Sequence, residues 1–235
     1  MAVSEPLRGP RVPNLIDIDA PASWPRRVEK VVSAVVAAHD EWQDAEYLDE
    51  LDLNADERAS IEGVCGEYLL QCYHATRLTP EEVQSVLVDG LVPLSAASVR
   101  NRFAQAEKQG HLSAELAARL LPGALELASA PNRANQVCLT SSRLSLRSRS
   151  SFRYLLSYWG GETVTMQLRR GDPTFDQLQN IGLPAVVVAA IPMETIDNRG
   201  GFVDVPGHLV ARRLDLSPRG SVYLDRVAPG AVLQI

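Results

Sequence analysis

Apolar residues recur at helical spacing through the first half of the chain. The clearest case lies between Trp24 and Trp42, where valines recur every three or four positions and predict one buried helix face. Those valines are Val28, Val31, Val32, Val35 and Val36. The same spacing predicts helices at Asp56–Tyr68, Ser95–Gln109 and Ser113–Ala130, the last broken or kinked at Pro122-Gly123.

Short apolar or alternating runs predict strands, most of them in the last third of the chain. They cover Glu67–Tyr73, Gln136–Thr140, Thr163–Leu168, Ala185–Ile191, Phe202–Val205, His208–Arg212, Ser221–Arg226 and Ala231–Ile235. Because helices come early and strands late, the pattern indicates an α+β fold. We expect an N-terminal arm and helical extension over residues 1–66 and a core over 67–235. Within this core, residues 95–130 form a helical insertion.

The most specific local signal follows the first predicted strand. The strand ends in His74 and leads through a turn to Thr79-Pro80-Glu81-Glu82, which is the start of a helix. Thr79 and Glu82 are spaced as a capping box, and Pro80 suits the first helical position. Gly90 is placed to end this helix with a positive φ angle.

Charge is distributed unevenly along the 235 residues. The net charge is −6, but residues 40–67 are strongly acidic with Arg58 as their only Lys or Arg. Residues 128–161 contain no carboxylate and five arginines. The acidic stretch is typical of a solvated helical face, whereas a basic field beside a cleft attracts anionic ligands.

The composition excludes several classes of protein. The longest apolar run, Leu183–Met193, is too short to span a bilayer, so we expect no membrane association. The three cysteines fit no zinc motif and are typical of reduced thiols, and no secretory signal is visible. We therefore expect a cytoplasmic protein.

The first group of candidate site residues surrounds His74. Thr76 and Arg77 add a hydroxyl and a cation within three residues, which suits an anionic ligand rich in hydroxyls. The alternative is a strand-end histidine bonded to the backbone. Ser141 and Arg143 follow a predicted strand and offer further donors to phosphate, although a serine-rich turn has the same composition.

The second group supplies aromatic rings and carboxylates. Tyr154 and Tyr158 are four positions apart on a predicted helix, as stacking or core residues would be. Glu162 follows Trp159-Gly160-Gly161 and is the best-placed acid, with Asp225 as its rival. Either carboxylate would stabilise positive charge that develops on a sugar carbon.

The segment Cys72–Arg77, followed by the capped helix ending at Gly90-Leu91, resembles the first motif of the His-Tyr-Glu class of ADP-ribosyltransferase-like proteins. The resemblance implies a split antiparallel sheet and NAD as a substrate. It implies that His74 contacts the nicotinamide ribose, that Thr76 and Arg77 lie near the cofactor, and that Tyr154 or Tyr158 packs on the nicotinamide. The family's acid would be Glu162 or Asp225, or is absent.

The leading hypothesis is therefore an NAD-dependent ADP-ribosyltransferase that acts as an intracellular toxin or defence effector. Its acceptor would be a nucleic acid or a protein, and an antitoxin would be a natural neutralising partner. One alternative is an RNA 2′-phosphotransferase, which needs no glutamate. The other is a non-catalytic module on the same fold that binds a nucleotide or a nucleic acid.

Overall fold

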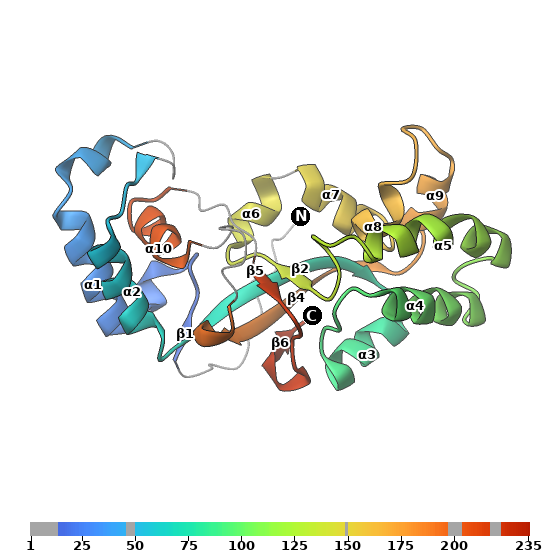
Figure 1. The fold of residues 1–235 in the computed structure, drawn as a ribbon, viewed down its shortest axis with the longest axis horizontal. Coiled ribbons are helices and arrows are strands. Elements are labelled where there is room, and N and C mark those ends of the chain that lie inside the picture. The colour runs from blue at the N-terminus through green and yellow to red at the C-terminus, as the bar shows by residue number, and fades with distance from the viewer. Residues whose placement is uncertain (1–13, 46–49, 149, 197–203, 217–221) are drawn as a thin grey trace, which may run out of the picture.

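The computed structural model describes residues 14–45, 50–148, 150–196, 204–216 and 222–235, and it combines helices and strands as predicted. A four-stranded sheet runs along the middle of the molecule in the order β1-β2-β4-β6 (Figure 1). Its strands are β1 (Leu15–Ile16), β2 (Leu69–Leu78), β4 (Leu183–Pro192) and β6 (Val232–Gln234). The prediction of an α+β fold is confirmed at this level.

The longest pairing joins β2 and β4. All ten residues of β2 pair antiparallel with β4, from Leu69 opposite Pro192 to Leu78 opposite Leu183. The predicted central strand at Ala185–Ile191 is therefore confirmed. The expectation that the first strand ends at His74 is wrong, because pairing with β4 extends it to Leu78.

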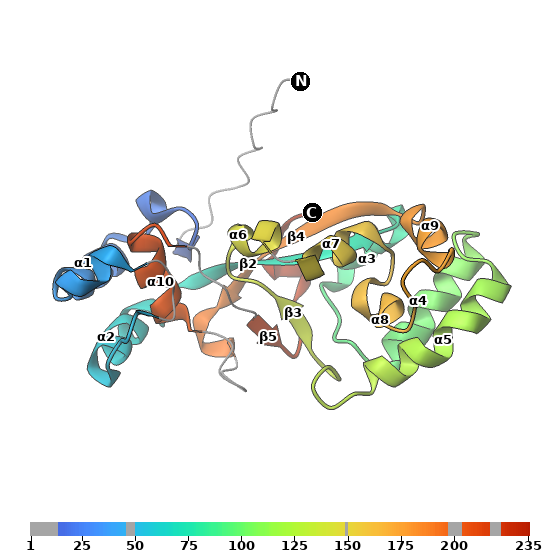
Figure 2. The same ribbon diagram turned by 90° about the horizontal axis from the view of Figure 1, so that it is seen from above.

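A second, two-stranded sheet lies beside β2 (Figure 2). It contains β3 (Val137–Leu139) and β5 (Val222–Leu224), which pair antiparallel. A single antiparallel bridge between Tyr73 and Thr140 connects it to β2.

Most helices gather at the two ends of the sheet (Figure 1). At one end α1 (Arg26–Ala37), α2 (Ala55–Cys65) and α10 (Val205–Arg213) contact one another. They share one apolar core with β2 and β4, which includes Ile61, Leu70 and Leu209. This core joins residues from both sides of the predicted boundary at residue 66.

The other end is built around Trp159, which is fully buried. Its apolar cluster draws on α4 (Ala96–Lys108), α5 (Ala114–Ala128) and α8 (Gly161–Thr165). The remaining elements are α3 (Pro80–Asp89), α6 (Arg143–Ser148), α7 (Ser150–Ser157), α9 (Thr174–Gln179) and the 3-10 turns η1 (Pro21–Ser23), η2 (Asp40–Asp44), η4 (Met193–Thr195) and η5 (Pro229–Ala231).

The local signals for helix ends are confirmed. Thr79 and Glu82 form the capping box of α3, and Ser95 caps α4. Gly90 ends α3 with φ 77°, and a Cβ atom there would stand 2.0 Å from the Val227 carbonyl oxygen. Helix α5 continues through Pro122.

Two predicted strands are helices. Thr163–Leu168 falls on α8 and the turn after it, because Gly160, with φ 80°, redirects the chain into a helical turn that buries Val164. His208–Arg212 lies in α10, whose first turn is capped by the Asp204 side chain. Its apolar run reflects burial over most of the helix surface rather than a strand. The predicted strand at Phe202–Val205 falls largely outside the described residues, and Val205 begins α10.

The link from α1 to α2 contains a bonded histidine. The His39 ring stacks on Trp42, with centroids 3.7 Å apart. Its two nitrogens each lie 2.7 Å from a carboxylate, Glu41 on one side and Glu57 on the other. Hydrogen bonds to these two glutamates raise the pKa of His39, which favours the charged ring.

Candidate functional site at the open edge of β2

The feature that distinguishes β2 is where its pairing with β3 stops. Tyr73 and Thr140 exchange both backbone hydrogen bonds, each 2.8 Å long. In an antiparallel ladder the next such pair would be Ala75 and Cys138. Instead, the His74 Nδ1 lies 2.8 Å from the Cys138 carbonyl oxygen. The His74 side chain thus bonds the Cys138 carbonyl, which the Ala75 N–H would bond in a continued ladder. Strands β2 and β3 separate beyond this point.

This bond fixes the form of the His74 ring. A carbonyl oxygen only accepts hydrogen bonds, so Nδ1 carries the proton. Burial lowers the pKa of His74, the Cys138 bond opposes that shift, and the positive charge of Arg102 adds to it. The ring is therefore neutral at pH 7, and Nε2 is an acceptor. Within the described part of the chain, Nε2 has no hydrogen-bond partner.

Ala75 presents a backbone donor and acceptor that the ladder leaves unused. Its N–H and C=O point away from β4, because they have the same orientation along β2 as those of Tyr73. Neither group pairs with any residue that the structure describes. Ala75 is only 3% exposed, and an unpaired backbone group at such a position costs free energy until water or a ligand satisfies it.

Helix α4 closes the other end of this gap. The Arg102 Nη2 donates to the Arg77 carbonyl at 3.0 Å, while its Nε is 2.5 Å from Glu82. Its guanidinium carbon lies 4.8 Å from the centre of the Trp159 ring. We call the segment of β2 from His74 to Arg77, on the side away from β4, the open edge.

The open edge is a short segment of β2. Ala75 and Arg77 are about 7 Å apart along the strand at about 3.3 Å per residue. Thr76 lies on the same face of β2 as His74 by strand alternation. Its hydroxyl has no hydrogen-bond partner among the described residues. His74 and Thr76 are therefore brought together, as predicted.

Arg77 is used differently from the prediction. Its Nε donates to the Ile181 carbonyl at 2.7 Å and an Nη to the Leu156 carbonyl at 3.2 Å. Both acceptors are backbone groups, so the guanidinium anchors the end of α7 and the loop before β4. This geometry gives Arg77 a structural role.

Ser141 and Arg143 belong to a different cluster. Ser141 is buried, with its hydroxyl 3.1 Å from the His208 Nδ1. Arg143 bonds Asp17 and Asp19, the residues that follow β1. Burial raises the pKa of Asp17, and the Arg143 charge opposes that shift. The carboxylates that face this arginine therefore come from the N-terminal segment.

The predicted aromatic and acidic residues have other partners or face solvent. Tyr154 and Tyr158 lie against each other with ring centroids 5.8 Å apart, and Tyr154 is 47% exposed. Glu162 is paired with Arg133 at 3.1 Å, and Asp225 is exposed beyond β5. No hydrogen bond, ion pair or ring contact within the described ranges joins His74 to any of these four candidates.

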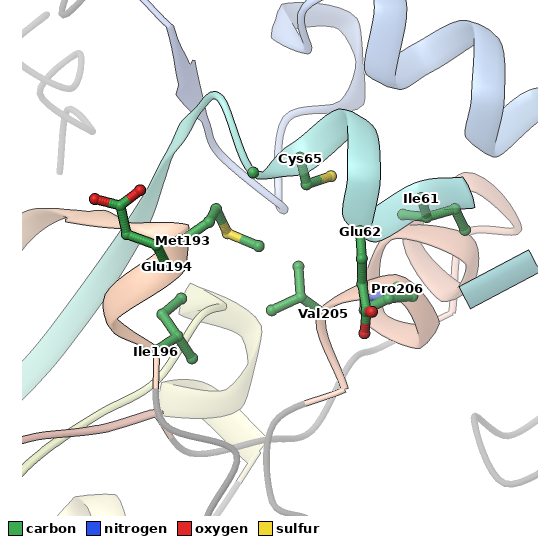
Figure 3. Close-up of a pocket in the computed structure, with 9 residues that line it drawn as sticks. Ile61, Glu62, Cys65, Met193, Glu194, Ile196, Val205 and Pro206 are labelled. Atoms are coloured by element: carbon green, nitrogen blue, oxygen red, sulfur yellow. The ribbon is translucent and has the colours of Figure 1, made fainter. Parts of the chain in front are cut away.

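A pocket of about 210 Å³ lies elsewhere, between α2, η4 and α10 (Figure 3). Met193 and Val205 face each other across it, and the Glu194 carboxylate points away. None of the predicted site residues lines this pocket. Its largely apolar lining offers no partner for the chemistry expected of His74.

Comparisons with known proteins add no relative. Protein-family models, curated proteins and solved structures give no match to this chain. The described residues also contain no group of three or more His, Cys, Asp or Glu side chains that could hold a metal ion. No helix in the described ranges is long and apolar enough to cross a membrane.

Three parts of the open edge were missed from the sequence. They are the Ala75 backbone, the Cys138 carbonyl and the Arg102 side chain. Ala75 carries no chemical signal, since its role depends on where pairing stops. Arg102 lies 25 positions after Arg77 in a helix that was expected to be only an insertion.

Proposed function

We propose that this chain binds NAD at the open edge of β2 and transfers its ADP-ribosyl group to a nucleic acid or protein acceptor. The observation that carries the proposal is the N–H and C=O of Ala75, which pair with no described residue and lie beside the neutral His74. A primary carboxamide has one carbonyl acceptor and an NH₂ donor, which match these two groups. Nicotinamide carries such a carboxamide on a flat ring.

The neighbouring side chains suit the rest of the ligand. The unprotonated Nε2 of His74 accepts a hydrogen bond from a ribose hydroxyl, and the Thr76 hydroxyl donates or accepts another. The separation of β2 from β3 is also the feature expected from the resemblance to ADP-ribosyltransferase-like proteins, whose sheet is split.

In the proposed transfer, the bond between C1′ of the ribose and the nicotinamide nitrogen breaks. Nicotinamide leaves as a neutral molecule with the electron pair of that bond. C1′ then forms a bond to an oxygen or nitrogen of the acceptor, whose proton passes to water. A carboxylate near C1′ would stabilise the positive charge that develops there.

A second candidate function is NAD binding without transfer. It is favoured by one observation: Glu162 is already paired with Arg133. The variant Glu162→Gln distinguishes the two candidate functions. If Glu162 is the catalytic acid, the variant binds NAD but releases no nicotinamide; if the protein only binds NAD, the variant binds it as the wild type does. Asp225→Asn is the parallel variant for the other carboxylate.

The proposal is tested by incubating the protein with NAD and candidate acceptors and measuring the release of nicotinamide. We expect release by the wild type and a loss of about ten-fold in His74→Ala, because the hydrogen bond from the ribose hydroxyl to Nε2 disappears. His111→Ala is the matched control, since His111 bonds Glu81 and no residue of the open edge among the described interactions. Absence of both nicotinamide release and NAD binding in the wild type would refute the proposal.

A further inference from the structure

Arg102 is the cation at the end of the open edge that retains unused donors. A guanidinium has five N–H groups in a fixed fork. Two are committed in the structure, Nε to Glu82 and one on Nη2 to the Arg77 carbonyl. The other three N–H groups have no hydrogen-bond partner among the described residues, and the side chain is 33% exposed.

Glu82 holds this guanidinium in place without closing its free side. The carboxylate accepts hydrogen bonds from the Thr79 backbone N–H and the Trp159 indole in addition to the Arg102 Nε. It is therefore occupied on several sides and contacts only one edge of the fork. The Trp159 ring lies under the guanidinium and restricts its motion further.

Arg102 also lies close enough to His74 for its charge to act on that ring. It contributes to lowering the pKa of His74, after burial, the largest cause. The two cations that the sequence predicted, Arg77 and Arg143, are otherwise engaged. Arg77 bonds two backbone carbonyls, and Arg143 bonds two aspartates.

We propose that Arg102 is the anion-binding residue of the open edge and that its free N–H groups contact the pyrophosphate of NAD. The proposal rests on the proposed function for the identity of the ligand. A ligand whose carboxamide lies on Ala75 extends along β2 toward Arg77, where Arg102 closes the gap. A fixed guanidinium fork matches two phosphate oxygens at once. The helical insertion thus completes the site.

The test compares ligands with and without phosphate by isothermal titration calorimetry. The ligands are NAD, nicotinamide riboside, nicotinamide and inorganic pyrophosphate, and the proteins are the wild type, Arg102→Gln and Arg102→Lys. Arg100→Gln is the matched control, because Arg100 lies on the same helix and is exposed. Correct folding of each variant is checked by circular dichroism.

We expect Arg102→Gln to weaken NAD binding about ten- to a hundred-fold, as loss of a charge-assisted hydrogen bond does. Nicotinamide should bind this variant as it binds the wild type, which a merely structural role of Arg102 would not allow. Arg102→Lys should bind NAD more tightly than Arg102→Gln but more weakly than the wild type. Arg100→Gln should bind NAD as tightly as the wild type does.

Equal NAD affinity in Arg102→Gln and the wild type would overturn the role of Arg102 and leave the proposed function standing. A wild type that binds pyrophosphate through Arg102 but not NAD would overturn the proposed function and leave the anion site standing. If Arg102→Gln does not fold, the test is the ligand preference of the wild type. The wild type must then bind NAD at least about ten-fold more tightly than nicotinamide riboside. Equal affinity for the two ligands would overturn the inference.

Discussion

Replacing Arg77 by methionine tests whether this residue is structural, as its contacts indicate. Methionine keeps an apolar stem of similar length but removes the guanidinium. The Ile181 and Leu156 carbonyls then lose donors at 2.7 and 3.2 Å. Hydrogen bonds to charged groups contribute about 1.5–3 kcal/mol each. Because the site is only partly buried, we take the lower half of that range for each of the two bonds and expect a loss of about 3–4.5 kcal/mol.

The assay is urea unfolding followed by circular dichroism, together with NAD affinity by calorimetry. The unfolding midpoint should fall while the slope m stays constant, since the surface exposed on unfolding does not change. NAD affinity should change by less than about three-fold, because binding interactions at Arg102 are retained. Arg100→Met, an exposed change on α4, should alter stability by less than about 0.5 kcal/mol.

The opposite result would refute this reasoning. Unchanged stability in Arg77→Met, combined with a large loss of NAD affinity, would make Arg77 the phosphate ligand suggested by the sequence motif. It would also remove the reason for assigning that role to Arg102. Arg77→Lys sharpens the comparison, because a lysine keeps the charge but cannot bond both carbonyls with a rigid fork.

Three further predictions concern other parts of the molecule. The raised pKa of His39 means that its stabilising contribution is complete below about pH 6.5 and is lost as the pH rises through the folded-state pKa. The melting temperature should therefore fall over that range, and in His39→Gln this fall should disappear; an unaltered profile would contradict the assignment. Gly90→Ala should destabilise the protein by at least about 2 kcal/mol in urea unfolding, because a side chain is strained at this positive φ and would meet backbone atoms; unchanged stability would contradict the geometry. In thiol titration with Ellman's reagent, exposed Cys138 should react quickly in the native protein. Cys65, whose pKa burial raises to about 12, and Cys72 should react only after unfolding, so three fast thiols in the native state would contradict the structure.

Local signals in the sequence were sufficient for some elements and not for others. The capping box of Thr79 and Glu82 was predictable because every interaction in it lies within four residues. His208–Arg212 was not, because an apolar run reads the same in a buried helix and a buried strand. The length of β2 depends on ten pairings with β4, which lies more than 100 residues away.

The residues of the candidate site also divide into those that local sequence predicted and those that depend on distant parts of the chain. His74 and Thr76 were predicted from a motif of neighbouring residues on one strand. The Ala75 backbone became significant only because β3 separates after Tyr73, and no residue type encodes that separation. Arg102 was missed because its contacts with Arg77, Glu82 and Trp159 are all distant in sequence.

The most direct test of the proposed site follows the Ala75 amide by nuclear magnetic resonance. In the ligand-free protein this N–H should exchange with solvent faster than the amide of Tyr73, which is bonded to Thr140. Adding NAD should shift the Ala75 resonance strongly and slow its exchange. The deamidated analogue, nicotinic acid adenine dinucleotide, should bind more weakly, because its carboxylate can accept from the Ala75 N–H but has no N–H to donate to the Ala75 carbonyl. If NAD binds and the Ala75 amide does not respond, or if both dinucleotides bind with equal affinity, carboxamide recognition at the open edge is wrong.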